Sequence, residues 1–194
     1  DWPPRMERPT LIPRAFWFLR HGETDWNARN LSQGNVDIPL NEVGIAQAKS
    51  AAALLKDRGI RSIVASTLSR AHDTARTVGS VIGRPVALDD ELRENSFGVQ
   101  EGQPMSDWFA AWVDGTATPE GAEPFMDLRA RAVRAINRAQ QHESPLLIVA
   151  HGALFRATRA EMNLEPNIRT PNAVPFFCEP GTTPQKPWTL TPAS

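Results

Sequence analysis

Short apolar runs alternate along this chain with longer segments whose apolar residues recur at helical spacing. The apolar runs predict strands at residues 15–19, 62–65, 86–88 and 145–150, with two further extended segments at 173–178 and 188–190. The helical spacing predicts helices at 41–59, 69–82, 105–113, 125–139 and 152–162. We expect Asn41 and Ser69 to be helix N-caps and Gly59 to supply a C-terminal stop. Strands that alternate with helices predict an α/β fold, a three-layer sandwich in which a mainly parallel sheet has helices on both faces.

Three segments lack this periodicity. Residues 1–14 contain four prolines and several charges, so they predict an irregular N-terminal extension that contributes little to stability. We expect residues 15–194 to form a single α/β domain, which is an ordinary length for one core. Residues 22–39 predict a long loop with a binding role, and residues 89–123 are mostly loop around one short helix.

The composition excludes some classes of partner. The chain has 21 basic and 22 acidic residues and a net charge of -1, which argues against a nucleic-acid or membrane surface built on overall charge. No apolar run approaches the roughly 18 residues that a membrane span needs. The single cysteine, Cys178, cannot form an internal disulfide and fits a reducing compartment. We therefore expect a cytoplasmic protein, and any anion site must be local.

Candidate chemistry gathers where three predicted strands end. The first strand runs into Arg20, His21 and Gly22, the second is followed by Arg70, and a fourth leads into His151. In parallel sheets, ligands bind beyond the carboxyl ends of the strands, so we expect these side chains to share one edge of the sheet. Either histidine alone could be an ordinary structural residue, but two of them at equivalent strand ends are harder to dismiss.

The tripeptide Arg20-His21-Gly22 suits attack on phosphorus. An imidazole with an ordinary pKa near about 6.5 is largely neutral, and therefore nucleophilic, at pH 7. A guanidinium offers paired donors to phosphate oxygens, and glycine allows close approach of backbone to a ligand. A strand end that happens to carry Arg and His remains the alternative for the tripeptide taken by itself.

Taken together, these residues closely resemble the signature of the histidine phosphatase superfamily, the phosphoglycerate mutase-like proteins. The resemblance begins with the run RHGETDWN at residues 20–27 and continues through residues 33–48. It includes STLSRA at 66–71, LRE at 92–94 and VAHG at 149–152, and it covers residues 16 to about 178. Asn172 also matches.

The resemblance implies a role for each matched residue. His21 would be the nucleophile that becomes phosphohistidine, and Glu94 would be the proton donor. Arg20, Arg70 and His151 would bind the phosphoryl oxygens, with Asn27 as a further donor. The resemblance also implies that no metal is used, and we expect this protein to need no cofactor. Glu101 is a rival acid, but it falls outside the matched triplet and fits a structural hydrogen bond better.

Physical chemistry supports these roles independently. Phosphoryl transfer depends on positioning and charge stabilisation, and Arg20, Arg70 and a protonated His151 could offset a phosphate dianion without Mg²⁺. The expected function is therefore hydrolysis of a small phosphorylated metabolite. Two alternatives remain, a cofactor-dependent phosphoglycerate mutase and a non-catalytic phosphate-site scaffold. Only 26 residues separate Glu94 from Gly121, which leaves no room for the long insertion of the mutases. The oligomeric state stays open, a homodimer included.

Two details of the variable segment stay open. Trp108 and Trp112 lie at helical spacing and fit core or lid packing, with a place in the pocket wall as the alternative. Pro124 stands where many family members have a serine at the start of the long helix. Because proline is tolerated in a first helical turn, we expect the fold to survive and any contact from that serine to be absent.

Overall fold

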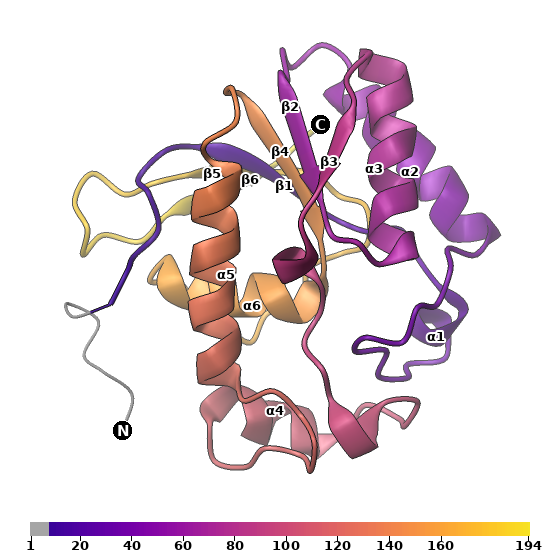
Figure 1. The fold of residues 1–194 in the computed structure, drawn as a ribbon, viewed down its shortest axis with the longest axis vertical. Coiled ribbons are helices and arrows are strands. Elements are labelled where there is room, and N and C mark those ends of the chain that lie inside the picture. The colour runs from indigo at the N-terminus through magenta and orange to yellow at the C-terminus, as the bar shows by residue number, and fades with distance from the viewer. Residues whose placement is uncertain (1–7) are drawn as a thin grey trace.

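A computed structural model describes residues 8–194 of the chain and contains one six-stranded sheet (Figure 1). The strands in sequence order are β1 (Phe16–Arg20), β2 (Ser62–Ala65), β3 (Val86–Leu88), β4 (Leu146–Ala150), β5 (Phe176–Glu179) and β6 (Thr189–Pro192). Their order across the sheet is β3-β2-β4-β1-β5-β6. The first four pair in parallel, while β5 and β6 are antiparallel. The predicted mainly parallel sheet is confirmed.

Helices cover both faces of this sheet, as the sequence predicts (Figure 1). The helices α2 (Glu42–Leu55) and α3 (Ser69–Ile82) pack on one face, and α5 (Phe125–Ala139) and α6 (Gly152–Glu161) pack on the other. A short helix, α4 (Asp107–Asp114), packs against the first residue of α5. The Trp112 ring meets the Phe125 ring edge to face, with ring centroids 5.1 Å apart. The remaining elements are α1 (Asp25–Ala28) and the 3₁₀ turns η2 (Asp90–Leu92) and η3 (Gly98–Gln100).

Alternation along β1 divides the core into two layers. Phe16 and Phe18 belong to the apolar cluster under α5 and α6, whereas Trp17 and Leu19 belong to the cluster under α2 and α3. Successive side chains of a strand point to opposite faces, so a strand covered on both sides must be apolar throughout. Phe18 stacks on Phe155 of α6 with ring centroids 4.0 Å apart, which fixes that helix against the strand.

Most helix boundaries agree with the sequence, and the differences have local causes. Asn41 caps α2 by accepting a hydrogen bond from the Gly44 N–H, as predicted, although the helix ends at Leu55, before Gly59. The N-cap position of α3 is Leu68, so the prediction that Ser69 is the N-cap was wrong. Ser69 is the first helical residue, and its N–H and hydroxyl both donate to Asp37.

Two predicted loop and strand assignments also need correction. The loop at 22–39 contains α1, which the capping box of Thr24 and Asn27 begins. The late strand β5 begins at Phe176, three residues later than expected. Ala173 has a φ of 54°, in the left-handed region, and cannot be part of an extended strand.

The N-terminal segment is irregular where it is described, but it is not detached. Residues 8–14 contain no helix or strand, yet the Leu11 side chain is buried in the core under α5 and α6. Arg8 forms an ion pair of 3.1 Å with Glu161, and the Ile12 N–H donates to Asn137. The expectation of little contribution to stability must therefore be revised for this part of the segment, while residues 1–7 lie outside the described residues.

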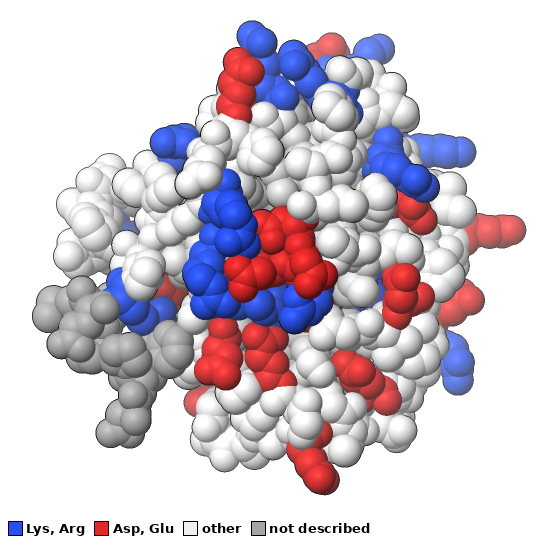
Figure 2. All heavy atoms as spheres, viewed as in Figure 1, with Lys and Arg blue, Asp and Glu red and all other residues white. Residues whose placement is uncertain are grey.

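A network of charged side chains ties α5 to η2. Figure 2 shows basic and acidic residues intermixed over α5, and the pairs there include Arg134 and Arg138 with Glu91, both at 2.8 Å. Hydrogen bonds from these two arginines lower the pKa of Glu91 to about 2. Exposed pairs of this kind contribute little singly, but here they hold the turn that precedes Glu94. Within the described residues, no helix combines the length and apolar character that crossing a membrane requires.

Leu11→Ala is expected to lower the free energy of unfolding by about 2 kcal/mol, because it removes a buried aliphatic side chain from the core. Ile12→Ala is the matched control, since its side chain is only partly buried, and it should cost less than half as much. Urea titrations of the two variants measure the difference. A loss for Leu11→Ala no larger than that for Ile12→Ala would contradict the stabilising role assigned to the buried Leu11 side chain.

Candidate active site

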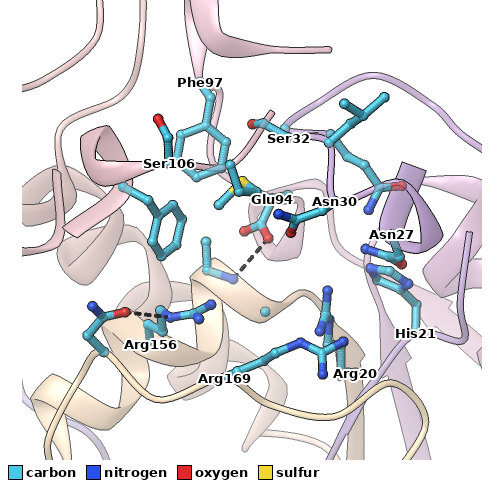
Figure 3. Close-up of a pocket in the computed structure, with 18 of the residues that line it drawn as sticks. Arg20, His21, Asn27, Asn30, Ser32, Glu94, Phe97, Ser106, Arg156 and Arg169 are labelled. Carbon is cyan, nitrogen blue, oxygen red and sulfur yellow. Dashed lines mark hydrogen bonds between the residues drawn. The ribbon is translucent and has the colours of Figure 1, made fainter. Parts of the chain in front are cut away.

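A pocket of about 440 Å³ opens at the carboxyl ends of β1, β2 and β4 (Figure 3). Five of the residues predicted from the sequence line it, namely Arg20, His21, Asn27, Arg70 and Glu94. The sixth, His151, is fully buried directly behind His21, and the two ring centroids are 5.3 Å apart. The sheet edge therefore brings together all six candidate residues, which come from widely separated parts of the chain.

The His21 ring is held in one orientation by its own backbone. Its Nδ1 lies 2.7 Å from the carbonyl oxygen of Gly22. A carbonyl can only accept, so Nδ1 carries the proton and Nε2 keeps its lone pair. The His21 N–H donates to the Ala150 carbonyl oxygen at 3.1 Å, and its own carbonyl oxygen accepts from Asn172 at 3.0 Å. The backbone on both sides of the ring is thus fixed, which is what a nucleophile requires.

Gly22 is required at its position by close packing. A methyl group there would overlap the backbone of Gly44 at the start of α2. The Gly22 N–H donates to the Thr74 hydroxyl at 3.1 Å, and that hydroxyl donates to the Arg70 carbonyl oxygen at 2.7 Å. This chain of hydrogen bonds joins the His21 loop to the helix that carries Arg70.

Two guanidinium groups approach the pocket, and among residues 8–194 no carboxylate is hydrogen-bonded to either. Arg70 is 1% exposed and donates to the carbonyl oxygens of Val36 and Gly34 at 2.7 and 2.8 Å. Arg20 donates to the Thr170 carbonyl oxygen at 2.7 Å. Within residues 8–194, the Nε of each has no hydrogen-bond partner. Burial lowers the pKa of both arginines to about 10, so both stay charged at neutral pH.

The same environment keeps both histidines neutral. The pKa of His21 lies well below 6.5, first because of burial and then because of the charges of Arg70 and Arg20. The pKa of His151 is lowered well below 6.5 for the same reasons. His151 is therefore neutral in the ligand-free protein, whereas the sequence analysis invoked its protonated form only beside a phosphate dianion. A bound phosphate dianion would favour the charged form by supplying the missing counter-charge.

Glu94 is fixed at the N-terminus of α6. Its Oε2 accepts from the Ala153 N–H at 2.9 Å, and its Oε1 accepts from the N–H groups of Leu154 and Asn95 at 3.0 Å (Figure 3). Carboxylates are stabilised at helix N-termini, where free N–H groups and the helix dipole meet. The carboxylate of Glu94 therefore stands on the pocket wall in one defined orientation.

Arg131 of α5 holds the loop that carries Glu94. Its guanidinium donates to the carbonyl oxygens of Glu91 and Arg93, both at 2.7 Å, and forms an ion pair of 2.7 Å with Glu123. The sequence analysis missed this positioning residue, since a mid-helix arginine carries no signal of its partners. Glu101 lies elsewhere: its Oε2 accepts from the N–H groups of Asn35 and Phe97, which confirms the structural role expected for it.

Asn27 presents its amide nitrogen to the pocket. Its Oδ1 is occupied by the Thr24 N–H at 3.1 Å and the Asn172 amide at 3.3 Å. The Nδ2 group is the part left to donate to a ligand beside His21 (Figure 3). This arrangement agrees with the donor role expected of Asn27.

The two tryptophans of α4 do not line the pocket. Trp112 is fully buried and donates to the Glu123 carbonyl oxygen at 2.9 Å, and Trp108 packs edge to face on Phe97. Phe109, from the same helix, faces the pocket instead. Pro124 is the residue before α5, and the helix begins at Phe125, so the fold accommodates the proline as predicted.

The pocket wall also contains residues that sequence reasoning did not single out. They are Asn30, Ser32, Ser106, Arg156, Asn167 and Arg169 (Figure 3). Arg156 lies one helical turn after Gly152, and this spacing could have placed it on the face of α6 that meets the pocket. Arg169 lies in a loop, where no periodicity could have located it. Among the described residues, no three His, Cys, Asp or Glu side chains form a cluster suited to a metal ion.

Comparison with known proteins gives consistent matches. The family model of the histidine phosphatase superfamily (branch 1) matches residues 16–171. The "Uncharacterized phosphatase PhoE" of Bacillus subtilis is 34% identical over 150 residues, covering 77% of each chain. A "Probable phosphoglycerate mutase GpmB" of Yersinia pestis is 35% identical, over 70% of this chain and 68% of the relative. The solved structure of a mycobacterial glucosyl-3-phosphoglycerate phosphatase with VO3 superimposes with a TM-score of 0.79 at 31% identity, over 91% of this chain and 97% of that one.

Both active-site histidines are expected to remain neutral at pH 6 in the ligand-free protein, because burial and the two arginines lower their pKa values. NMR titration of ¹⁵N-labelled histidine side chains, with the His21 and His151 signals assigned by substitution, measures this directly. The direction of these pKa shifts also determines how the stability of the protein depends on pH. Histidines of the unfolded chain take up protons first as the pH falls below about 6.5, so stability falls from that pH downward. Protonation of either ring above pH 6.5 would contradict the electrostatic interpretation.

Proposed function

This chain belongs to the histidine phosphatase superfamily, and from that premise we propose that it hydrolyses small phosphomonoesters through a phosphohistidine formed on Nε2 of His21. One observation supports the proposal above the others. The nucleophilic nitrogen stands beside two charged guanidinium groups to which no carboxylate of the described part of the chain is hydrogen-bonded. A phosphate dianion supplies the two negative charges that this arrangement lacks.

In the first step, the lone pair of His21 Nε2 attacks phosphorus and the bond from phosphorus to the ester oxygen breaks. Arg20, Arg70 and the Asn27 amide hold the other phosphoryl oxygens, where their charge and fixed donors stabilise the transition state. Glu94, a carboxylate in the ligand-free site, takes up a proton before this step and gives it to the departing alkoxide, which leaves as an alcohol. His151, behind His21, becomes protonated as the dianion binds and adds to the positive field.

In the second step, water attacks the phosphohistidine. Glu94, now a carboxylate, accepts a proton from that water, the bond from Nε2 to phosphorus breaks, and inorganic phosphate leaves. The lone pair returns to Nε2 and Glu94 is again protonated, so the cycle closes. Dividing hydrolysis in this way replaces one difficult step by two easier ones.

Hydrolysis is favoured over a mutase reaction by the short cover of the pocket. A mutase must shield its phosphoenzyme from water, which requires a closed site. Here the segment between Glu94 and Gly121 contributes only five residues to the pocket wall, namely Phe97, Met105, Ser106, Phe109 and Ala110. Against the third alternative, a non-catalytic scaffold, stands the complete set of nucleophile, acid and phosphate ligands.

The remaining features of the proposal concern the whole protein. We propose that residues 15–194 act as one catalytic domain on a small phosphorylated substrate, with neither a metal ion nor another cofactor. A cytoplasmic location is proposed from the single buried cysteine. We propose no nucleic-acid or membrane partner, because the net charge is -1, and we assign no oligomeric state.

His21→Ala is expected to abolish phosphomonoesterase activity, whereas excess chelator should leave the wild-type rate unchanged. His142→Ala is the matched control, since that histidine is exposed and far from the pocket residues, and it should retain full activity. The rate of phosphate release from p-nitrophenyl phosphate measures the activity of His21→Ala, of His142→Ala and of the wild type with chelator. An acid-labile phosphoenzyme should form in wild type and be absent from His21→Ala.

The outcome that would contradict this mechanism is inactivation by chelator that Mg²⁺ or Zn²⁺ reverses. The mutase alternative needs a second readout. With 3-phosphoglycerate and a trace of 2,3-bisphosphoglycerate, phosphorus NMR should show inorganic phosphate as the main product. Build-up of 2-phosphoglycerate ahead of phosphate would replace the hydrolase assignment by a mutase.

Glu94→Gln is expected to slow phosphorylation of His21 by about a hundredfold or more for alkyl phosphates, because a poor leaving group needs the donated proton. For p-nitrophenyl phosphate, whose leaving group needs no proton, the loss should be much smaller. Glu101→Gln is the control: it should lower the melting temperature without changing the ratio between the two substrates. Single-turnover experiments measure the phosphorylation rate for each substrate. If Glu94→Gln lowered this rate equally for both substrates, Glu94 would not be the acid.

A further inference from the structure

Ser66 has a buried hydroxyl to which the proposed mechanism assigns no task. The residue follows β2, at the start of the run STLSRA, and its side chain has no exposed surface. Its N–H donates to the carbonyl oxygen of Val149 in the neighbouring parallel strand β4, at 3.0 Å. Its Oγ lies 2.8 Å from Nε2 of His151, the residue that follows β4. The pairing of two strands therefore holds the serine against the histidine.

The direction of this hydrogen bond follows from counting donors and acceptors. The Ser66 oxygen already accepts from the Leu68 N–H at 3.2 Å. Among residues 8–194, the one other hydrogen bond of the Ser66 side chain is that to His151, so the hydroxyl hydrogen has no other acceptor. A buried donor without an acceptor costs free energy, which favours donation from Ser66 to Nε2 of His151. The proton of a neutral ring is then on Nδ1.

The opposite direction would leave more groups unsatisfied. If Nε2–H of His151 donated to Ser66, the serine hydrogen and a bare Nδ1 would both be buried without partners in the described part of the chain. With the direction chosen above, Nδ1–H alone lacks one. The position of the proton matters because the pKa of His151 lies well below 6.5, through burial first and nearby charges second, so the ring of the ligand-free protein has a single N–H to donate.

Two arginine nitrogens near His151 also lack an acceptor. Within residues 8–194, the Nε of both Arg20 and Arg70 is buried without a hydrogen-bond partner, as is Nδ1 of His151. Arg20 Nε lies close to the residue after His151, because a methyl group on Gly152 would be 3.1 Å from it. The His151 and His21 rings have centroids 5.3 Å apart, and Arg20 and His21 line the same pocket (Figure 3). A phosphoryl group on His21 brings three terminal oxygens, which are the acceptors that such donors need.

We propose that Ser66 is a positioning residue, whose hydroxyl holds the proton of neutral His151 on Nδ1, from where it is donated to a phosphoryl oxygen. The inference rests on the proposed phosphatase function and deepens it by naming the group that makes His151 a hydrogen-bond donor before the ring takes up any proton. When the bound dianion brings a proton to Nε2, the serine hydroxyl turns and accepts from it, because a hydroxyl can donate or accept. Ser66 therefore supports one ring orientation in both charge states.

NMR of ¹⁵N-labelled histidine side chains measures the tautomer, because two-bond couplings between carbon-bound protons and the ring nitrogens show which nitrogen carries the proton. The chain has four histidines, and the signal lost in His151→Gln identifies this ring. Ligand-free wild type at neutral pH should show a neutral His151 with its proton on Nδ1. Inorganic phosphate should shift the Nδ1–H proton signal, because that group then gains an acceptor.

Ser66→Ala removes one oxygen atom and should move the His151 proton at least partly to Nε2, since no group then donates to that nitrogen. The kcat/KM for p-nitrophenyl phosphate should fall about tenfold, as expected for a lost hydrogen bond to a charged group. Ser66→Thr keeps the hydroxyl and should retain the tautomer and a rate within about threefold of wild type. Ser66→Cys, whose thiol is a weak donor, should shift the tautomer in the same direction as Ser66→Ala.

Ser80→Ala is the matched control. It removes the same atom from an exposed serine of α3, whose hydroxyl donates to the Thr77 carbonyl oxygen of its own helix, and it should change neither the tautomer nor the rate. The tautomer separates positioning from a merely structural role. A loss of folded protein lowers the rate, but it leaves the tautomer of the folded molecules unchanged.

The possible results separate this inference from the proposed function. A wild-type His151 with its proton on Nε2 would overturn the role of Ser66 and leave the phosphatase function standing, and so would a tautomer that neither Ser66→Ala nor Ser66→Cys alters. No response of Nδ1–H to inorganic phosphate would overturn its donation to the phosphoryl group. The expected tautomer, its dependence on Ser66 and its response to phosphate, in a wild type that hydrolyses no ester, would uphold the inference and overturn the function.

Discussion

The arrangement of this pocket depends on holding guanidinium groups at the carboxyl edge of the sheet without neutralising them. Arg20 and Arg70 are fixed by carbonyl oxygens of Thr170, Val36 and Gly34, which orient the side chains but leave their full charge. Removing such charges from water costs free energy, and a carboxylate partner would be the ordinary compensation. Among the described residues, neither arginine is hydrogen-bonded to a carboxylate. The uncompensated charge keeps the neighbouring imidazoles neutral, and in the proposed mechanism the same charge attracts the phosphate dianion.

The sheet topology makes this concentration of charge possible. Because β1 and β4 are adjacent and parallel, His21 and His151 leave the sheet side by side, and β2 on the other side of β4 leads to the helix that carries Arg70. The helix that follows β4 points its N-terminus into the same space, and its free N–H groups fix the carboxylate of Glu94. Two different physical effects thus bring the proposed acid and the proposed nucleophile together: hydrogen bonding at a helix end positions Glu94, and strand register positions His21.

The two ends of the pocket differ in how firmly they are built. The phosphate end consists of strand ends and largely buried side chains that hydrogen bonds hold in place, so we expect its geometry to depend little on the ligand. The opposite end consists of a short helix and loops, and its charged member Arg169 is exposed. A rigid phosphate site joined to a more adaptable wall allows the chemistry to stay constant while the wall selects the alcohol part of the ester.

The sequence by itself determined the secondary-structure pattern and the chemistry of the phosphate end. Apolar runs and helical periodicity identified the six strands and the helices α2 to α6 to within a few residues, because burial imposes those periods locally. His21, Arg70, Glu94 and His151 could be named in advance because each occupies a short, distinctive motif. Only the tertiary structure placed Arg131, Arg156 and Arg169, whose partners lie on other elements, and it also placed Leu11 in the core. It alone decided that His151 is neutral, since a pKa depends on burial and on charges that sequence neighbours do not supply.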